Sequence, residues 1–173
     1  MSQKSEIIVT RYASPCGDLL LGSFGENLCL CDWVAEKGKR DCVHDRLKRH
    51  LDARFKEGVS PVNVMAACQL DEYFAGARRH FDLSLIFVGT EFQKSVWRRL
   101  TEIPYGVTVS YRELSCGLGN RQAVRAVARA NGANALSVIV PCHRVIGSNG
   151  SLTGYAGGLD AKEFLLRLEG VVL

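Results

Sequence analysis

The chain has 173 residues, of which 47% are hydrophobic, so it can bury a core as one large domain or as two small ones. No stretch approaches the ~20 apolar residues that cross a bilayer, which excludes an integral membrane protein and predicts no membrane partner. The formal net charge is +4, and residues 94–144 hold eight Lys and Arg against two Asp and Glu, so a polyanion contact would be confined to one surface.

The compartment follows from the N-terminus and the cysteines. Residues 1–6 lack a signal-peptide pattern, so we expect a cytoplasmic protein in a reducing environment. In that environment the seven cysteines predict buried apolar side chains and one reactive thiol, rather than a disulfide framework.

A small sheet is expected first, because three apolar or alternating segments are separated by turn-forming residues. These segments are 7–9, 19–24 and 28–34, and their close spacing favours an antiparallel meander. Helices are expected at 41–56 and 67–77, and residues 81–89 read as a connector or a short strand. We place a domain boundary after residue 88, which gives domains 1–88 and 89–173.

The second domain is predicted to be helical from its capping boxes. Thr90 with Gln93 begins one helix, and Ser110 with Glu113 begins a short one that stops at 117–119. The inward stripe of the first of these helices is expected to be Phe92, Val96, Trp97 and Leu100.

A helix-turn-helix is expected next, because Asn120 could cap a further helix over residues 121–130. Arginines recur at intervals of four on that helix, so they would share one face: Arg121, Arg125 and Arg129. The small Ala126 between them would let the helix approach a surface closely. Such arginines contact phosphates in nucleic-acid complexes, although an ordinary solvated face explains the pattern equally well.

Cys142 and His143 suggest nucleophilic chemistry. Cys142 follows the apolar run 138–140, where a buried strand ending in Pro141 would fix the direction of the sulfur. The thiolate is the reactive form of cysteine, and a neighbouring imidazole can favour it.

Glu169 is the expected partner of His143. It follows the last helix, which begins near Asp160 and should stop at Gly170. The residues of that helix expected to face inward are Phe164, Leu165 and Leu168. A carboxylate at a helix C-terminus opposes the macrodipole, so Glu169 needs a specific partner such as a histidine that requires orientation.

Metal binding is the competing use of cysteine. Cys29, Cys31, Cys42 and His44 have the composition of a zinc set, but their spacing does not match a zinc knuckle. We therefore expect no metal.

A highly specific motif then identifies a family. It is Pro141-Cys142-His143-Arg144-Val145 together with its flanking segments. Those segments are Phe92-Gln93 with Val96-Trp97, Ile103-Pro104-Tyr105-Gly106, Ser110-Tyr111, Arg125-Ala126-Val127, Ala130-Asn131-Gly132-Ala133-Asn134, Gly154-Tyr155-Ala156-Gly157-Gly158-Leu159 and Leu165-Leu166. From Phe92 to Glu169 the chain closely resembles the O6-alkylguanine-DNA alkyltransferases (methylated-DNA–protein-cysteine methyltransferases). The first 85 residues match more loosely, through the turn Ser14-Pro15-x-Gly17.

The resemblance implies an α/β (α+β) fold, with an N-terminal ribonuclease H-like sheet carrying helices and a C-terminal helical domain with a helix-turn-helix. By analogy Cys142 accepts the alkyl group and His143 takes its proton through a water. Glu169 would orient His143, Asn134 would tie the site to the recognition helix, and Tyr111 would hydrogen-bond the flipped base.

The resemblance also implies the partner, double-stranded DNA carrying O6-alkylguanine. Arg125 would fill the gap left in the duplex, and the minor groove would receive the helix-turn-helix. Further DNA contacts are expected at Ser110, Arg121, Ala126 and Arg129. The guanine pocket would be lined by Tyr155, the backbone of Ala156, and the carbonyls of Cys142 and Val145. Ser137 replaces a proline of certain relatives beside this pocket, which leaves its tolerance for bulky alkyl groups open.

The resemblance predicts irreversible transfer, one event per molecule, by a monomer that needs no cofactor and is associated with the nucleoid if the host is prokaryotic. Activity toward O4-alkylthymine and clustering along DNA are left open. Three alternatives remain at this point. They are a non-catalytic lesion-binding protein, a helix-turn-helix regulator and a cysteine hydrolase.

Overall fold

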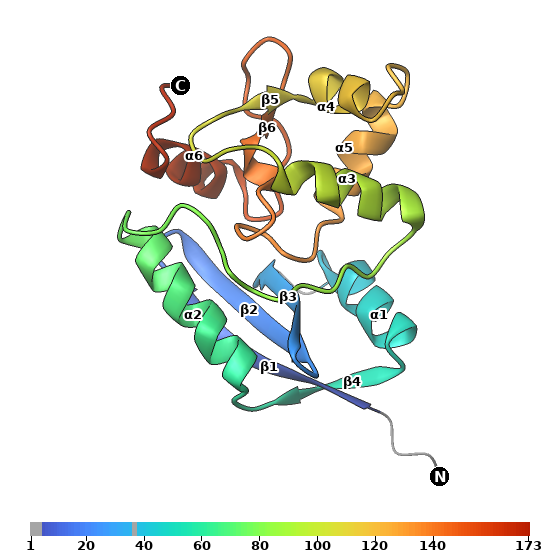
Figure 1. Cartoon of the computed structure of the whole chain (residues 1–173), viewed down its shortest axis with the longest axis vertical. Coiled ribbons are helices and arrows are strands. Elements are labelled where there is room, and N and C mark those ends of the chain that lie inside the picture. The colour runs from blue at the N-terminus through green and yellow to red at the C-terminus, as the bar shows by residue number, and fades with distance from the viewer. Residues whose placement is uncertain (1–4, 36–37) are drawn as a thin grey trace. The chain divides into compact units, whose positions relative to one another are not determined.

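The structure is a computed structural model, and it describes residues 5–35 and 38–173. The chain divides into two compact units, one up to Gly89 and the other from Thr90 onward (Figure 1). Strands with accompanying helices build the first unit and helices dominate the second, so the predicted α/β fold class is confirmed. Among the described residues no helix is long and apolar enough to cross a bilayer.

A four-stranded sheet in the order β3-β2-β1-β4 forms the first unit. Its strands are β1 Ser5–Ser14, β2 Gly17–Phe24, β3 Asn27–Trp33 and β4 Ala53–Glu57. The first three form the predicted antiparallel meander, because both of their ladders are antiparallel. Ile7, Leu19 and Leu21 are buried, since alternate residues of a strand face the same side of the sheet.

The predicted helix over residues 41–56 is wrong in its second half. Helix α1 spans Asp41–His50, and β4 follows it and pairs in parallel with β1. The chain turns between them at Asp52, whose φ is +43°. Pairing with the open edge of β1 satisfies the backbone of β4, a long-range gain that the local charge pattern does not reveal.

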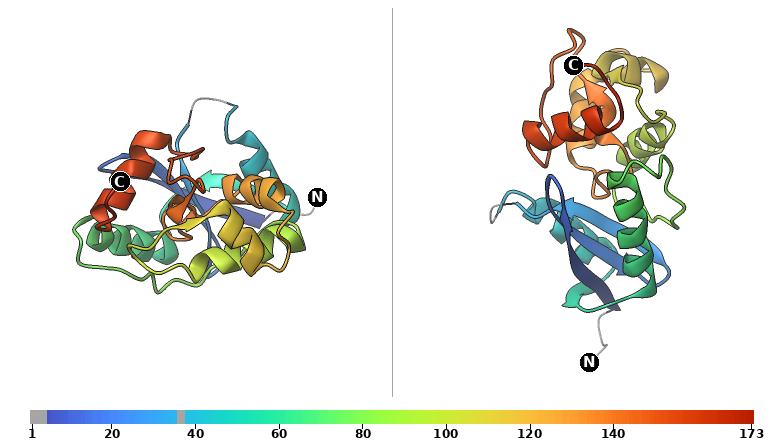
Figure 2. Two further views of the ribbon diagram at one scale, coloured as in Figure 1. Left: turned by 90° about the horizontal axis from the view of Figure 1, so that it is seen from above. Right: turned by 90° about the vertical axis from the view of Figure 1, so that its left-hand side faces the viewer.

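Helix α2 spans Pro61–Phe74 and begins earlier than predicted. The Ser60 side chain accepts a hydrogen bond from the backbone N–H of Asn63, and proline occupies the first helical position. The helix lies along the sheet (Figure 2), with Leu70 and Tyr73 fully buried. Because the Ser-Pro start signal overrides the weaker apolar pattern here, the helix begins at residue 61 rather than 67.

Residues 81–89 form a connector that touches the open edge of β3. Leu85 forms a parallel bridge with Leu28, and the Leu28 N–H donates to the Ser84 carbonyl at 2.8 Å. Ile86 N–H donates in turn to the Leu28 carbonyl at 3.0 Å. The connector therefore shields part of an edge strand.

The cysteines of the first unit do not gather into a site. Cys29 and Cys31 are buried in β3, whereas Cys42 is exposed. Within residues 5–35 and 38–173 no group of His, Cys, Asp and Glu side chains has an arrangement that could hold a metal ion. None of the seven cysteines, all of which the structure describes, forms a disulfide.

Residues 90–173 are all described and contain four α-helices with a small parallel sheet. The elements are α3 Glu91–Thr101, β5 Val109–Ser110, α4 Tyr111–Gly117, α5 Val124–Gly132, the 3-10 turn Cys142–Arg144, β6 Val145–Ile146 and α6 Leu159–Leu168. Both predicted capping boxes are confirmed, at Thr90 and at Ser110. Helix α4 packs against α5, and the two form the predicted helix-turn-helix.

Helix α3 packs through its middle and C-terminal turns. Val96, Trp97 and Leu100 are buried as predicted, and the Trp97 indole N–H donates to the Ala130 carbonyl of α5 at 2.8 Å. The prediction for Phe92 is wrong, because 41% of this residue is exposed. Phe92 lies in the first turn of α3, one turn before the buried Val96.

Helix α5 starts at Val124 rather than at residue 121. Asn120 does not cap it, because its side-chain oxygen accepts from the Gln122 N–H at 3.1 Å and closes a turn before the helix. The prediction that Arg121 shares a helical face with two further arginines is therefore wrong. Arg125 and Arg129 do lie one turn apart on α5.

The apolar run before Pro141 is a buried turn, so the prediction of a strand there is wrong. Val138 has a φ of +70°, and the Val140 N–H donates to the Leu136 carbonyl at 2.8 Å. β-branched residues favour strands locally, but here they fill the core from a turn whose hydrogen bonds are internal.

Helix α6 ends as predicted, with Gly170 at a φ of +83° directly after Glu169. Leu165 is buried, but Phe164 is 36% exposed and Leu166 takes the inward position instead. The buried face of α6 is therefore rotated by part of a turn from the predicted one.

Candidate active site

Cys142 begins the 3-10 turn that follows the buried turn at 138–140. Its backbone N–H donates to the Val140 carbonyl at 2.8 Å, and its carbonyl accepts from the side-chain amide of Asn131 at 3.4 Å. Only 3% of the residue is exposed. The sulfur therefore sits on a backbone that is held from both sides.

Asn134 holds the same turn from within. Its amide nitrogen donates to the Val140 carbonyl at 2.9 Å, and its oxygen accepts from the Leu136 N–H at 2.9 Å. Asn131, which lies in the last turn of α5, is the residue that links α5 to the Cys142 carbonyl. The sequence places Asn131 in the family motif but does not reveal this contact.

His143 and Glu169 form the predicted pair. His143 Nε2 lies 2.8 Å from Glu169 Oε1, and both side chains are fully buried. Glu169 Oε2 also accepts from the Gly106 N–H at 3.1 Å. Gly106 has a φ of +75°, and a Cβ there would lie 2.7 Å from the Glu169 carbonyl, so glycine is needed at this close approach.

Arg144 completes the buried ion cluster, a role that the sequence did not reveal. Its Nε donates to Glu169 Oε2 at 2.9 Å and its Nη2 to Oε1 at 3.0 Å, while Nη1 donates to the Ile103 carbonyl at 2.6 Å. This bidentate pairing compensates the burial of the carboxylate.

The cluster fixes the protonation of both partners. Burial alone would raise the pKa of Glu169, but hydrogen bonds from His143 and Arg144 hold that pKa far below its usual range. Burial lowers the pKa of His143 and outweighs the opposite effect of Glu169. A neutral imidazole whose Nε2–H donates to Glu169 leaves Nδ1 as an acceptor, and within the described chain Nδ1 has no hydrogen-bond partner.

Lys162 is a second buried cation, which no sequence pattern indicates. Its Nζ donates to the Val145 carbonyl at 2.6 Å and to the Thr153 carbonyl at 2.9 Å. The same nitrogen lies 6.0 Å from the centre of the Tyr111 ring. Burial lowers the pKa of Lys162 to about 8. Lys162 therefore joins the strand after Cys142 to the loop that precedes Tyr155.

Tyr111 and Tyr155 line a hollow of about 530 Å³ beside α5. The lining residues are Tyr111, Val124, Arg125, Ala128, Gly132, Thr153, Gly154, Tyr155 and Ala156. Burial raises the pKa of Tyr111, so its hydroxyl keeps its proton and can donate. The rings of Tyr155 and His143 meet edge to face, with centroids 6.5 Å apart, so the hollow borders the buried cluster.

The structure brings most of the predicted site residues together. The Val145 carbonyl is bound by Lys162, and Val145 does not line the hollow. Ser110 caps α4, with its hydroxyl accepting from the Glu113 N–H at 3.1 Å. Arg121 does not line this hollow. It does not line a second hollow either, which lies between α5 and the first turn of α3.

A cysteine with an adjacent, carboxylate-oriented histidine is typical of thiol group-transfer and hydrolytic sites, and a helix-turn-helix is typical of nucleic-acid-binding proteins. Comparison with known families decides between these uses. Residues 7–87 match the 6-O-methylguanine DNA methyltransferase, ribonuclease-like domain, and residues 91–171 match the 6-O-methylguanine DNA methyltransferase, DNA binding domain. The chain belongs to this family.

Individual relatives agree with that assignment. The methylated-DNA–protein-cysteine methyltransferase of Methanosarcina acetivorans is 47% identical over 159 residues, which cover 92% of this chain and 96% of the relative. The crystal structure of the Mycobacterium tuberculosis O6-methylguanine methyltransferase superposes with a TM-score of 0.77 at 39% identity, covering 95% of this chain and 92% of that one. Mycobacterium tuberculosis OGT in complex with DNA gives a TM-score of 0.77 at 38% identity with the same coverage.

Proposed function

We propose that the protein repairs DNA by direct reversal, moving the alkyl group from O6 of a guanine in duplex DNA to Sγ of Cys142. The observation that carries this proposal is the buried imidazole next to Cys142, with Nε2 fixed on Glu169 and Nδ1 still able to accept a proton. The relatives' names support alkylated DNA as the substrate.

His143 acts as the base. A water between the thiol and Nδ1 carries the proton from Cys142 to the imidazole, and Glu169 stabilises the imidazolium that forms. The thiolate attacks the alkyl carbon in line with the bond to O6. The sulfur–carbon bond forms as the carbon–oxygen bond breaks, and the electron pair of that bond stays on the guanine.

The hollow beside α5 is the proposed guanine pocket. A base must leave the stack to reach Cys142, and extrusion costs a few kcal/mol. The protonated Tyr111 hydroxyl donates a hydrogen bond to the departing guanine. The guanine anion then takes up a proton from water, and the imidazolium of His143 releases the thiol's proton to water, so the protons balance. Tyr155 and Ala156 also line this hollow.

Arg125 offsets the cost of extrusion by filling the gap in the duplex. Its side chain is exposed, lines the guanine pocket, and forms no ion pair within the described chain. Asn134 holds the Cys142 turn from within and Asn131 ties that turn to α5, so that docking of the helix-turn-helix in the minor groove positions the thiol. The remaining proposed DNA contacts are Ser110, Arg121, Ala126 and Arg129.

The product is a thioether, which is stable in water, so each molecule acts once. No nucleotide, metal or organic cofactor takes part in the proposed steps. The substrate-binding form is a monomer on double-stranded DNA.

The test is incubation of the protein with duplex DNA that contains one O6-methylguanine. Intact protein should gain the mass of one CH₂, located on the peptide that carries Cys142, and the oligonucleotide should regain ordinary guanine. Cys142→Ala is the control and should bind the lesion without changing it.

An unchanged protein mass with the lesion intact would reject the proposal and leave a lesion-binding protein. If repair continues in Cys142→Ala, Cys142 is not the residue that accepts the alkyl group. Turnover of many ester or peptide substrates per molecule would indicate a hydrolase instead.

A further inference from the structure

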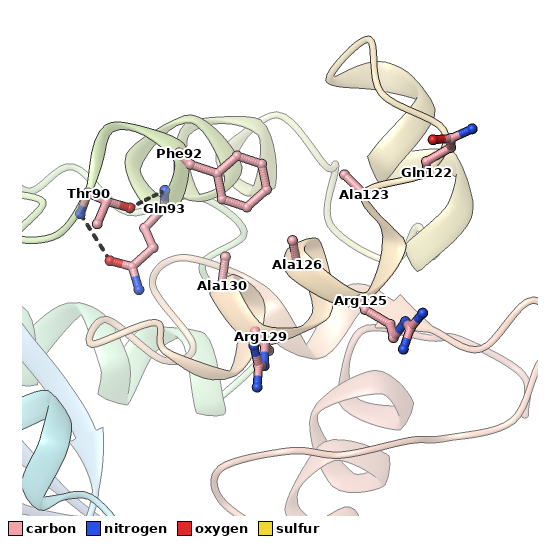
Figure 3. A pocket seen from close by; sticks show the side chains of 9 residues that line it. All are labelled: Thr90, Phe92, Gln93, Gln122, Ala123, Arg125, Ala126, Arg129 and Ala130. Atoms are coloured by element: carbon pink, nitrogen blue, oxygen red, sulfur yellow. Dashed lines mark hydrogen bonds between the residues drawn. The ribbon is translucent and has the colours of Figure 1, made fainter.

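A second hollow lies on the other side of α5, between that helix and the first turn of α3 (Figure 3). It has a volume of about 700 Å³ and is open to solvent. Its lining residues are Thr90, Phe92, Gln93, Gln122, Ala123, Arg125, Ala126, Arg129 and Ala130. We refer to it as the α3–α5 groove.

The two hollows are lined by different residues of α5, apart from Arg125. Ala123, Ala126 and Ala130 face the α3–α5 groove, at the spacing of one helical face. Arg125 lines both hollows, so it stands on the ridge between the α3–α5 groove and the proposed guanine pocket.

The α3–α5 groove has an apolar wall and a basic one. Figure 3 shows the Phe92 ring projecting toward the side of α5 that carries the alanines. The exposed 41% of Phe92 is available to an apolar surface such as a sugar. Arg129 and Arg125 supply two positive charges, and no lining residue is acidic.

Within the described chain, both arginines of the groove lack an ion pair with a carboxylate, as do Arg98, Arg112 and Arg121 outside it. Elsewhere in the unit Arg99, Arg144 and Arg167 each pair with a glutamate. Within residues 5–35 and 38–173 no such ion pair or side-chain hydrogen bond involves Arg125 or Arg129. Their charges are therefore not neutralised by the protein, which suits a polyanionic partner.

We propose that the α3–α5 groove receives the backbone of the undamaged strand, with Arg129 on a phosphate and Phe92 against the adjoining sugar. The inference rests on the proposed function. A DNA duplex has two backbones, and the proposed guanine pocket receives its base from the damaged strand. Because Arg125 stands on the ridge between the hollows, the groove beyond it faces the complementary strand.

The test uses the full chain and three variants, Arg129→Gln, Phe92→Ala and Arg98→Gln. Arg98 is exposed on α3 outside the groove, so its variant loses the same charge elsewhere. Lesion-free duplex and single-stranded oligonucleotides are the probes, with affinity measured by fluorescence anisotropy over a range of salt concentrations.

Arg129→Gln should weaken duplex binding about tenfold and reduce the salt slope by about one unit, as expected for one lost phosphate contact. Phe92→Ala should weaken duplex binding without changing the slope. Single-strand affinity should stay within about twofold for both variants, as should duplex affinity for Arg98→Gln. Equal losses on single and double strands would overturn the inference, as would no loss on duplex.

Neutral methylphosphonate linkages then assign the strand. Neutralising one phosphate near the lesion site on the complementary strand should weaken the wild type but have little effect on Arg129→Gln, since both changes remove the same contact. If binding is weakened by a neutral linkage in the damaged strand instead, the inference is wrong. In the wild type and in Arg98→Gln, a single-stranded O6-methylguanine oligonucleotide should methylate Cys142. The absence of this methylation from the wild type, with single strand and duplex alike, would instead count against the proposed function.

Discussion

At the scale of single residues, the site depends on how burial changes two titratable groups in opposite senses. Glu169 remains a carboxylate because His143 and Arg144 hydrogen-bond to it, whereas His143 remains neutral because burial opposes its charge. A neutral imidazole oriented by a carboxylate is what a base requires. The buried cation Arg144 makes this arrangement sensitive to loss of the negative charge on Glu169.

Glu169→Gln should slow alkyl transfer about a hundredfold, since general-base assistance contributes factors of this size. The amide keeps the shape but leaves Arg144 without a charged partner, so the unfolding temperature should also fall. DNA affinity should change by less than threefold. Transfer rates and affinities measured on the same preparation check this, and parallel losses of both would indicate misfolding instead.

Lys162 gives a pH dependence of stability whose sign follows from its pKa. The pKa is about 8 in the folded chain against an ordinary 10.5, so below pH 8 both states are protonated and folding bears the full cost of burying the charge. Between pH 8 and 10.5 the folded chain releases the proton while the unfolded chain keeps it, so this term stabilises the fold as pH rises. The neutral amine still has two N–H donors for the Val145 and Thr153 carbonyls.

Comparison with Lys162→Met isolates that term, because other groups titrate alike in both proteins. The free energy of unfolding of the wild type, relative to the variant, should increase as pH rises from about 8 to 10.5. Denaturant unfolding at several pH values measures it. A constant difference over this range would contradict a lowered pKa.

At the scale of elements, α5 is the part on which the proposed chemistry converges. Its last turn holds the Cys142 carbonyl through Asn131, and its exposed side carries Arg125 between two hollows. Trp97 ties α5 to α3. Under the proposed function, a rigid helix that joins the thiol turn to the DNA-binding surface couples docking to positioning of the nucleophile.

Arg125→Ala should impair repair of duplex O6-methylguanine at least tenfold, because the extruded base then leaves an unfilled gap that costs on the order of a few kcal/mol. Reaction with free O6-benzylguanine should change less than twofold, provided that the pocket admits the benzyl group. The two second-order rates measure this. Equal effects on both substrates would remove the proposed role, and Arg98→Ala is the matched control.

At the scale of the whole molecule, the two units contribute differently. The identified side chains of the site all come from residues 90–173. The first unit is a mixed sheet with helices whose described residues supply none of them. Since the proposed product is a thioether, the entire chain is consumed in one event.

Titration of excess duplex O6-methylguanine with protein should therefore give at most one lesion repaired per chain, with a sharp end point. Adding fresh DNA to reacted protein should give no further repair. A count well above one would show that the alkyl group leaves Cys142 and would contradict single turnover.

The sequence alone determined the features that depend on local chemistry. Both capping boxes, the three-stranded meander and the helix stop at Gly170 follow from short patterns whose hydrogen bonds close within a few residues. The pair His143–Glu169 was also foreseen, because a buried carboxylate at a helix end needs a partner. The specific motif around Cys142 pointed to the family that the comparisons confirm.

Other features depend on contacts between residues distant in the sequence, and only the tertiary structure decided them. Residues 53–57 became a strand because β1 offered a free edge, and residues 138–140 became a turn because the core filled around it. The exposure of Phe92, the pairing of Arg144 and the burial of Lys162 depend on which elements pack together. Packing acts between residues distant in the sequence, whereas periodicity and composition record only neighbours.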